Sequence, residues 1–363
     1  MTDTSRRDLL LGMGATAALV ACADTSTNAQ RKLGIAVAGV GSVAEGQMIP
    51  AIVGSTQCRL AGLVDIDRAR LSAMGSKFGL PEKALYTQQD FDRIAHDPEV
   101  DVVYIAVPNA LHAEYAIRAA RAGKHVLVEK PMATSVEDCL AMTRACRAAN
   151  RQLAVAYRLH HSPHHQAMLR SARDGALGRV ELIRADIGYP LEGNGGWRTH
   201  RALSGGGALL EQGVYCVNAA CSLAAAEPIE VNGVELKSDP ARFGEVDETV
   251  IWNMRFASGA MAQCSASYTM AKRNIWVGSH AGWFSLEEPF SFDEIAAITS
   301  EGPRKIPQVN QFELQINNFC SLVRSGRQPP PGISAAAGLR DVRIINAVYE
   351  SVRTGAPVAL TPT

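Results

Sequence analysis

A glycine-rich segment, Gly39-Val40-Gly41-Ser42-Val43-Ala44, stands between an apolar run and a helical pattern. In a G-x-G-x-x-A turn the first glycine, Gly39, permits a tight bend, and the second, Gly41, lets the backbone approach a pyrophosphate. Ala44 keeps the following helix close to the sheet, and the free N–H groups at its start attract phosphate oxygens. A structural turn is the alternative, but the strand–turn–helix context favours a dinucleotide site.

Asp65 ends the next apolar run, close to the spacing of an acid that binds the adenosine ribose hydroxyls. A carboxylate there repels a 2′-phosphate, so Asp65 favours NAD over NADP. Arg68 follows one turn later. It would either support NADP or be a solvated helix residue. Both cofactors therefore stay open.

Short apolar strands alternate with helical patterns over residues 32–156. Such alternation implies a parallel sheet covered on both faces, and right-handed crossovers make it a doubly wound, Rossmann-type α/β domain. The predicted strands are 33–38, 59–64, 102–107, 125–128 and 153–156, and the predicted helices are 43–53, 67–78, 110–122 and 135–150.

Strand-like patterns dominate residues 157–363, and a hairpin signal lies at 257–259. This half is predicted to be an α+β domain with a large, mostly antiparallel sheet and two closing helices. The predicted strands are 180–189, 229–236, 249–256, 260–268 and 274–278, and the predicted helices are 311–325 and 335–354.

Polar residues follow two of the first-half strands. Pro108, Asn109 and His112 come after one, and Glu129 and Lys130 end the next. Because ligands collect at the carboxyl edge of a doubly wound sheet, we expect Asn109 and His112 to line the cofactor cleft. Lys130 would project there beside the nicotinamide. As alternatives, His112 would be an ordinary residue of a helix start and Lys130 a surface lysine.

The chain resembles the glucose–fructose oxidoreductase and inositol dehydrogenase (GFO/IDH/MocA) family, and within it the glucose–fructose oxidoreductase-like branch. The resemblance covers nearly everything after Lys32. It is carried by P-N-x-x-H at 108–112, E-K-P at 129–131, A-Y-R-L-H at 156–160, W-R at 197–198, G-G-G at 205–207, E-Q-G-V-Y at 211–215 and A-V-Y-E-S at 347–351.

The resemblance implies that Lys130 holds the reacting hydroxyl, stabilises charge developing on it, and precedes a cis peptide bond to Pro131. Polyol dehydrogenases of the family carry D-x-x-x-H, whereas this chain has Glu211-x-x-x-Tyr215. Tyr215 is then expected to transfer the proton, with its pKa lowered by the lysine ammonium. A core tyrosine on a helix is the alternative. The longer Glu211 leaves its substrate contact open.

Further site residues follow from the same resemblance. Pro108 and Glu129 are expected at the cofactor, and Arg158, Trp197 and Arg198 are expected to close over it. His160 is expected to bind the substrate together with Lys130, Glu211 and Tyr215. The implied activity is hydride transfer to or from a sugar, either an aldose or a polyol.

Residues 1–31 read as a twin-arginine export signal and linker, with Arg6-Arg7 before an apolar run from Leu9 to Cys22. Cleavage would leave either a lipid-anchored Cys22 or a soluble protein. We expect a periplasmic protein, carried by the twin-arginine export machinery. Since that compartment holds no free dinucleotide pool, we expect a tightly bound, internally recycled NAD or NADP.

Two alternative functions stay open: an NAD-dependent glycoside hydrolase and a non-catalytic sugar-binding module. A homodimer or homotetramer is expected by analogy.

Lys plus Arg and Asp plus Glu both number 36, so net charge gives no attraction to nucleic acid. No cysteine pair has C-x-x-C spacing, and the seven cysteines after Cys22 are expected to be small core residues. The histidine-rich run 160–165 has no acid or cysteine at ligand spacing, so we predict no metal site.

Overall fold

The computed structural model describes residues 31–292 and 294–361. The chain from Leu33 onward forms one compact unit. The predicted export signal, including Cys22, lies outside the described residues. Among the helices that are described, none has both the length and the apolar character needed to cross a membrane.

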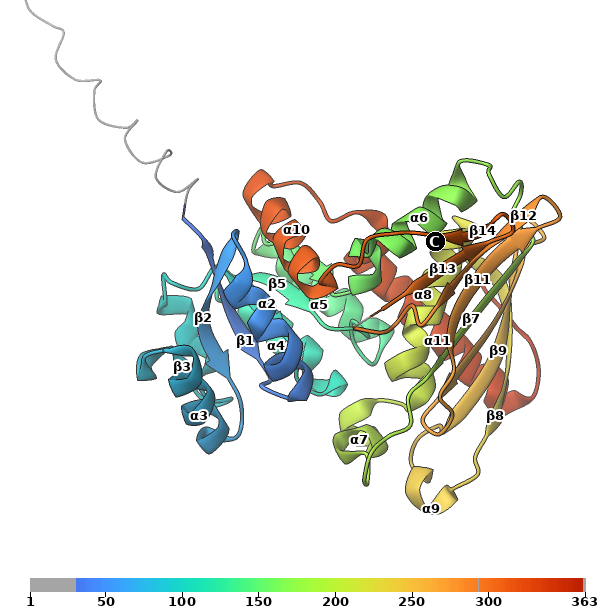
Figure 1. Ribbon diagram of the computed structural model, residues 1–363. Coiled ribbons are helices and arrows are strands. Elements are labelled where there is room, and N and C mark those ends of the chain that lie inside the picture. Colours follow the sequence, from blue (N-terminus) through green and yellow to red (C-terminus); the bar gives the residue numbers. More distant parts are fainter. Residues whose placement is uncertain (1–30, 293, 362–363) are drawn as a thin grey trace, which may run out of the picture. The chain divides into compact units, whose positions relative to one another are not determined.

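The first sheet has six parallel strands in the order β3-β2-β1-β4-β5-β6 (Figure 1). Its central strands are apolar at successive positions, as a sheet buried on both faces requires. Val102, Val103, Tyr104 and Ile105 are all fully buried. The strands are β1 (Leu33–Ala38), β2 (Cys58–Val64), β3 (Leu85–Tyr86), β4 (Val102–Ile105), β5 (His125–Val128) and β6 (Leu153–Val155).

Polar caps mark where the helices of this half begin. The side chain of Asp67 accepts the N–H of Arg70 at the start of α3, and that of Ser135 accepts the N–H of Asp138 at the start of α5. The helices are η1 (Ala44–Met48), α2 (Ile49–Gly54), α3 (Arg68–Phe78), η2 (Glu82–Ala84), η3 (Phe91–His96), η4 (Asn109–Leu111), α4 (His112–Arg121) and α5 (Val136–Ala148).

The second sheet has the order β14-β13-β12-β11-β7-β10-β9-β8-β15, and only the β7–β10 pair is parallel. In β9, Val250, Trp252, Met254 and Phe256 are buried in alternation with more exposed residues. The strands are β7 (Leu182–Gly188), β8 (Pro228–Leu236), β9 (Thr249–Phe256), β10 (Met261–Ser267), β11 (Arg273–Ser279), β12 (Gly282–Glu287), β13 (Ala296–Thr299), β14 (Gly302–Arg304) and β15 (Val358–Ala359).

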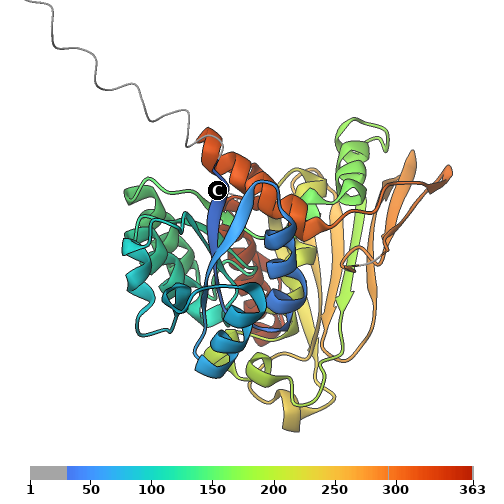
Figure 2. The same ribbon diagram turned by 60° about the vertical axis from the view of Figure 1, so that its left-hand side comes forward.

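Helices join the two sheets. α8 packs on β7 and β10, α11 packs on α5, α8 and β8, and α10 returns to α2 and β2 of the first half (Figures 1 and 2). The helices of this part are η5 (Arg158–His161), α6 (Pro163–Arg173), η6 (Gly196–Thr199), α7 (Arg201–Ser204), η7 (Leu209–Gly213), α8 (Val214–Ala224), α9 (Pro240–Phe243), α10 (Gln311–Ser325), η8 (Pro331–Ile333) and α11 (Ala335–Thr354).

The predicted fold class, a Rossmann domain followed by an α+β domain with a mostly antiparallel sheet, is confirmed. The bounds of β1, β5, β9, α10 and α11 are those expected from the sequence. The strands β3, β12, β13, β14 and β15 were not predicted. The helices α10 and α11 pack on helices of the first half. The residues after 157 therefore build the second sheet and also part of the covering of the first.

Candidate active site

The glycine turn directly follows β1. Gly39 has φ +94°, and a Cβ there would lie 2.5 Å from the carbonyl oxygen of Ala106. A Cβ at Gly41 would meet no atom within 4 Å. Gly39 therefore needs both its conformation and its lack of a side chain, whereas Gly41 keeps its side of the turn open. That open backbone fits the phosphates of a dinucleotide.

Asp65, at the end of β2, fixes this turn. Its carboxylate accepts the N–H groups of Val40 at 2.8 Å and Asp67 at 2.9 Å. Arg70 reaches within 3.7 Å of the same carboxylate, whereas Arg68 pairs with Glu82. The cation nearest the predicted ribose acid is thus Arg70, which the sequence had not singled out.

A cavity of about 430 Å³ opens beside the turn. Eleven of the predicted site residues line it. They are Gly41, Ala44, Asn109, His112, Glu129, Lys130, Arg158, Trp197, Arg198, Glu211 and Tyr215. Gly39, Asp65 and Pro108 shape the neighbouring turns instead, with Pro108 preceding η4.

Lys130 lies just beyond the end of β5, and its peptide bond to Pro131 is cis, as predicted. Its Nζ donates a hydrogen bond to the main-chain oxygen of Glu211 at 2.7 Å and lies 3.8 Å from the Glu211 carboxylate. The same nitrogen is 5.0 Å from the centroid of the Tyr215 ring. An ammonium from one half of the chain and a phenol from the other therefore share this cavity.

Tyr215, on the first turn of α8, is buried. Burial raises the pKa of its phenol, and the nearby Arg158 guanidinium lowers it only in part. The expectation that the Lys130 ammonium lowers this pKa is therefore corrected, since loss of solvent outweighs the neighbouring cations. The phenol is held in its protonated form.

Arg158, in η5, forms a wall of the cavity. Its guanidinium donates to Gln311 at 2.6 Å and to the main-chain oxygens of Ser291 at 3.3 Å and Phe290. It also lies over the rings of Tyr215, Phe292 and Phe312 at 5.8, 4.7 and 5.7 Å from their centroids. Because its guanidinium donates these hydrogen bonds to the protein, Arg158 is held against the Tyr215 ring and does not project freely toward a ligand.

Glu211 faces two cations. Arg198 Nε lies 3.3 Å from its carboxylate, and the Arg198 guanidinium stacks on Trp197 at 4.6 Å. Burial tends to raise the pKa of Glu211, but Lys130 and Arg198 together hold it below its ordinary value. Glu211 is therefore an anion that orients both cations at the rim of the cavity.

Glu129 connects the site to α10. Its Oε1 accepts the Tyr104 hydroxyl at 2.9 Å, and that hydroxyl oxygen accepts the Gln315 side-chain N–H at 2.7 Å. Burial raises the pKa of Glu129, and Lys130 opposes this rise. The chain of contacts fixes the residue that directly precedes Lys130.

Asn109 and His112 line the cavity as predicted, each held by main-chain oxygens. Asn109 Nδ2 donates to the oxygen of Ser204 at 3.0 Å. His112 lies with Nδ1 2.8 Å from the oxygen of Pro131 and Nε2 3.0 Å from that of Val107. Burial lowers the pKa of His112 to about 4, and the contacts with the two carbonyl oxygens oppose this shift.

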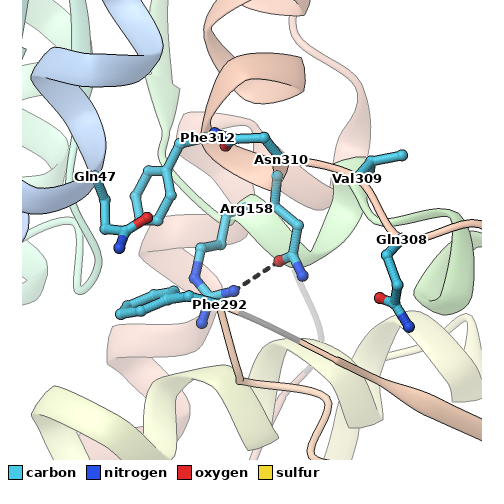
Figure 3. Close-up of a pocket in the computed structure, with 8 residues that line it drawn as sticks. Gln47, Arg158, Phe292, Gln308, Val309, Asn310 and Phe312 are labelled. Carbon is cyan, nitrogen blue, oxygen red and sulfur yellow. Dashed lines mark hydrogen bonds between the residues drawn. The ribbon is translucent and has the colours of Figure 1, made fainter.

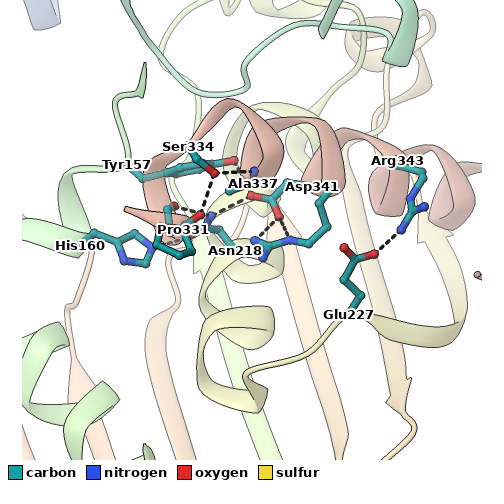
Figure 4. A network of polar contacts seen from close by, with 11 residues as sticks. Tyr157, His160, Asn218, Glu227, Pro331, Ser334, Ala337, Asp341 and Arg343 are labelled. Carbon is teal, nitrogen blue, oxygen red and sulfur yellow. Dashed lines mark hydrogen bonds and ion pairs between the residues drawn. The ribbon is translucent and has the colours of Figure 1, made fainter. Parts of the chain in front are cut away.

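The structure does not bring His160 to the cavity. Its Nε2 lies 2.6 Å from Asn218 Oδ1, inside the polar network that joins Asn218, Tyr157 and Asp341 (Figure 4). η5 turns Arg158 toward the cavity and His160 toward α8 and Gly332, so the expected substrate contact is corrected to a core contact. No group of three potential metal ligands occurs among the residues that the structure describes.

Sequence reasoning missed the aromatic side of the cavity. Tyr189 follows β7, Phe290 and Phe292 follow β12, and Phe312 begins α10. The Tyr189 hydroxyl donates to the oxygen of Phe290 at 2.9 Å. Tyr189 stood at the end of a predicted strand and Phe312 at the start of a predicted helix, but no pattern marked either as a site residue.

Comparison with known proteins agrees with this geometry. Residues 33–157 match the oxidoreductase family with an NAD-binding Rossmann fold (GFO/IDH/MocA), and residues 165–285 match the GFO/IDH/MocA C-terminal domain. An uncharacterized oxidoreductase of Rhizobium meliloti is 30% identical over 337 residues, which are 88% of this chain and 96% of that protein. The chain belongs to the GFO/IDH/MocA family and is an NAD(P)-dependent oxidoreductase.

Two relatives carry more specific descriptions. A D-xylose 1-dehydrogenase [NADP(+)] of Haloarcula marismortui is 29% identical over 345 residues, 90% of this chain and 92% of its own. The crystal structure of an aldose-aldose oxidoreductase from Caulobacter crescentus, complexed with glycerol, is 39% identical. It aligns with a TM-score of 0.87 over 91% of this chain and 100% of that one.

Proposed function

We propose that this protein oxidises one aldose and reduces a second carbonyl compound, while a nicotinamide dinucleotide stays bound between the two half-reactions. The observation that carries the proposal is the meeting of Lys130, Tyr215 and Glu211 in one cavity with the glycine turn. The likeness to an aldose-aldose oxidoreductase and to a xylose dehydrogenase supports a sugar as substrate.

A bound dinucleotide supplies the hydride chemistry, and the side chains handle the proton and the developing charge. Lys130 Nζ, held at the Glu211 main-chain oxygen, donates to the reacting oxygen of the sugar. The protonated Tyr215 gives its proton to a carbonyl oxygen during reduction and takes one from a hydroxyl during oxidation. Arg158 stabilises the phenolate that reduction leaves behind.

Retention of the cofactor is proposed from the twin-arginine pattern at Arg6-Arg7. A periplasmic enzyme has no dinucleotide pool to exchange with, so each electron pair taken from one sugar must leave with a second substrate. An aldose would yield a lactone and the second carbonyl an alcohol. NAD is favoured by Asp65, although Arg70 stands beside it.

The test is to purify the protein without added dinucleotide, identify the nucleotide released on denaturation by mass spectrometry, and then supply an aldose alone. We expect about one nucleotide per chain and equal amounts of lactone and alditol. Absence of nucleotide would refute retention. Release of an aglycone from a glycoside with no lactone would instead favour a glycoside hydrolase, and ligand binding without turnover would favour a sugar-binding module.

A homo-oligomer is proposed from the outward face of the second sheet. Val234, Leu236, Ile251 and Met261 are 65%, 58%, 43% and 39% exposed, and Val234 pairs with Ile251 across β8 and β9. Apolar residues in contact on one sheet face fit a self-complementary interface. Light scattering should find a dimer or tetramer, and Ile251→Arg should shift it toward the monomer.

A further inference from the structure

A second cavity, of about 310 Å³, is drawn with its lining residues in Figure 3. Arg158, Phe292 and Phe312 line both this cavity and the catalytic one, so the two cavities adjoin at these side chains. Gln47 of η1 and the segment leading into α10 complete the lining. Its volume falls in the lower part of the range of about 300–1,000 Å³ typical of ligand pockets.

Carboxamide groups dominate this second cavity. Asn310 uses its Oδ1 to cap α10, and Gln311 uses its Oε1 to accept Arg158, so their NH₂ groups are left as donors. Gln308 donates its Nε2 to the oxygen of Ile295, which leaves its Oε1 as an acceptor. The side chain of Gln47 makes no hydrogen bond within the described part of the chain. The lining thus offers both donors and acceptors, which suits hydroxyl groups because each of them both donates and accepts.

The charge of the cavity argues against an anionic ligand. Among the described lining residues the only charged side chain is Arg158, and its guanidinium is already bonded to Gln311, Ser291 and Phe290. No described lining residue is acidic. Phe292, which is 50% exposed, offers an aromatic surface where the two cavities adjoin. The chemistry therefore suits an uncharged, hydroxyl-rich ring with one apolar face.

We propose that this cavity binds the second ring of a disaccharide or glycoside whose first ring reacts at Lys130 and Tyr215. The proposal rests on the proposed sugar oxidoreductase function and names its substrate class. Because Phe292 lines both cavities and is half exposed, two linked rings would pass over it, from the reacting oxygen toward Gln47.

The experiment compares D-glucose with cellobiose and maltose in the protein carrying its dinucleotide. The variants are Gln47→Ala, which removes an amide, and Gln47→Trp, which fills the space. Gln89→Ala is the matched control, since Gln89 is exposed and lines neither cavity. We measure kcat/KM for each sugar and, by calorimetry, disaccharide binding to the Lys130→Ala background.

The wild type should prefer at least one disaccharide over glucose. Gln47→Ala should lower the ratio of kcat/KM for the disaccharide to kcat/KM for glucose about fivefold to tenfold, as expected for one lost hydrogen bond. Gln47→Trp should lower this ratio further. Gln89→Ala should leave the ratio unchanged. An equal effect of the Gln47 variants on both sugars, or no preference in the wild type, overturns the subsite. Absence of turnover with every sugar would refute the oxidoreductase proposal, and the calorimetry with Gln47→Trp would still decide the binding site.

Discussion

The guanidinium carbon of Arg158 lies 5.8 Å from the centroid of the Tyr215 ring, while Lys130 Nζ lies 5.0 Å from the same centroid. Two cations from different elements thus stand against one buried phenol. Arg158 is the cation that lowers the pKa of Tyr215, and Lys130 is the one tied to Glu211. In the proposed reaction, Arg158 would therefore support the proton donor, and Lys130 would hold the reacting oxygen.

Tyr215→Phe should reduce kcat by about two to four powers of ten, because the proton donor is lost while the ring remains. The content of bound dinucleotide should not change. Tyr189→Phe is the matched control, since it also lines the cavity but donates its hydroxyl to Phe290. Steady-state kinetics with equal losses in both variants would contradict the role of Tyr215.

The pH profile should report the phenol. Because burial raises the pKa of Tyr215, the deprotonated form that oxidation requires grows with pH, and the oxidation rate should still be rising at pH 9. Arg158→Gln removes a cation that lowers this pKa and should move the rising limb to still higher pH. Arg158→Lys should restore part of the shift. An oxidation rate independent of pH between 7 and 9 in the wild type would exclude this assignment.

The two glycines of the turn should respond differently to substitution. Gly41→Val places a side chain in open space, so folding should persist while dinucleotide binding falls at least tenfold. Gly39→Val meets the Ala106 carbonyl and requires a positive φ, so its Tm should fall. Thermal unfolding and the nucleotide released from each purified variant separate the two effects. Normal dinucleotide content in Gly41→Val would contradict the site.

Cofactor preference should depend on Asp65. Asp65→Ser removes the charge that repels a 2′-phosphate and leaves Arg70 to attract it. The ratio of the NADP and NAD dissociation constants should move toward NADP by about tenfold or more, as measured by protein fluorescence. Asp67→Ser, on the neighbouring residue, should leave this ratio close to that of the wild type.

Acid should destabilise the protein through its buried histidines. Burial lowers the pKa of His165 to about 3, and neither ring nitrogen has a hydrogen-bond partner among the described residues. Below about pH 6.5 the unfolded chain binds a proton that the folded chain does not, so stability falls from pH 6.5 toward pH 3. His165→Phe should raise Tm more at pH 5 than at pH 7.5. An equal gain in Tm at both pH values would contradict the explanation.

The sequence was informative where chemistry depends on local geometry. The turn from Gly39 to Ala44 and the position of Lys130 after β5 follow from strand–turn–helix patterns, and the structure brings both to one cavity. Tyr215 was found through its departure from a family pattern. The glycine turn and Lys130 each follow a strand, β1 or β5, whose bounds the apolar pattern predicted, whereas the helix α8 that carries Tyr215 was not predicted.

The site features that were predicted wrongly or missed depend on where a side chain points and how deeply it is buried. The spacing of residues in the sequence does not encode either property. His160 and Arg158 lie two residues apart, yet η5 sends them to opposite sides. The expected lowering of the Tyr215 pKa counted a neighbouring cation but not the loss of water around the ring. Phe290 and Phe292 come from a segment without helix or strand periodicity, so no pattern predicted them.

The path of α10 has a consequence for recombining this protein with its relatives. Its first turn supplies Phe312 to both cavities, while Asn317 further along accepts the Ser55 hydroxyl at 2.6 Å, just after α2. A chimera that exchanged only residues up to 157 would pair a foreign first half with this helix. A chimera should therefore show the substrate specificity of the parent that supplies both α10 and α2. A junction at residue 157 would take these two helices from different parents.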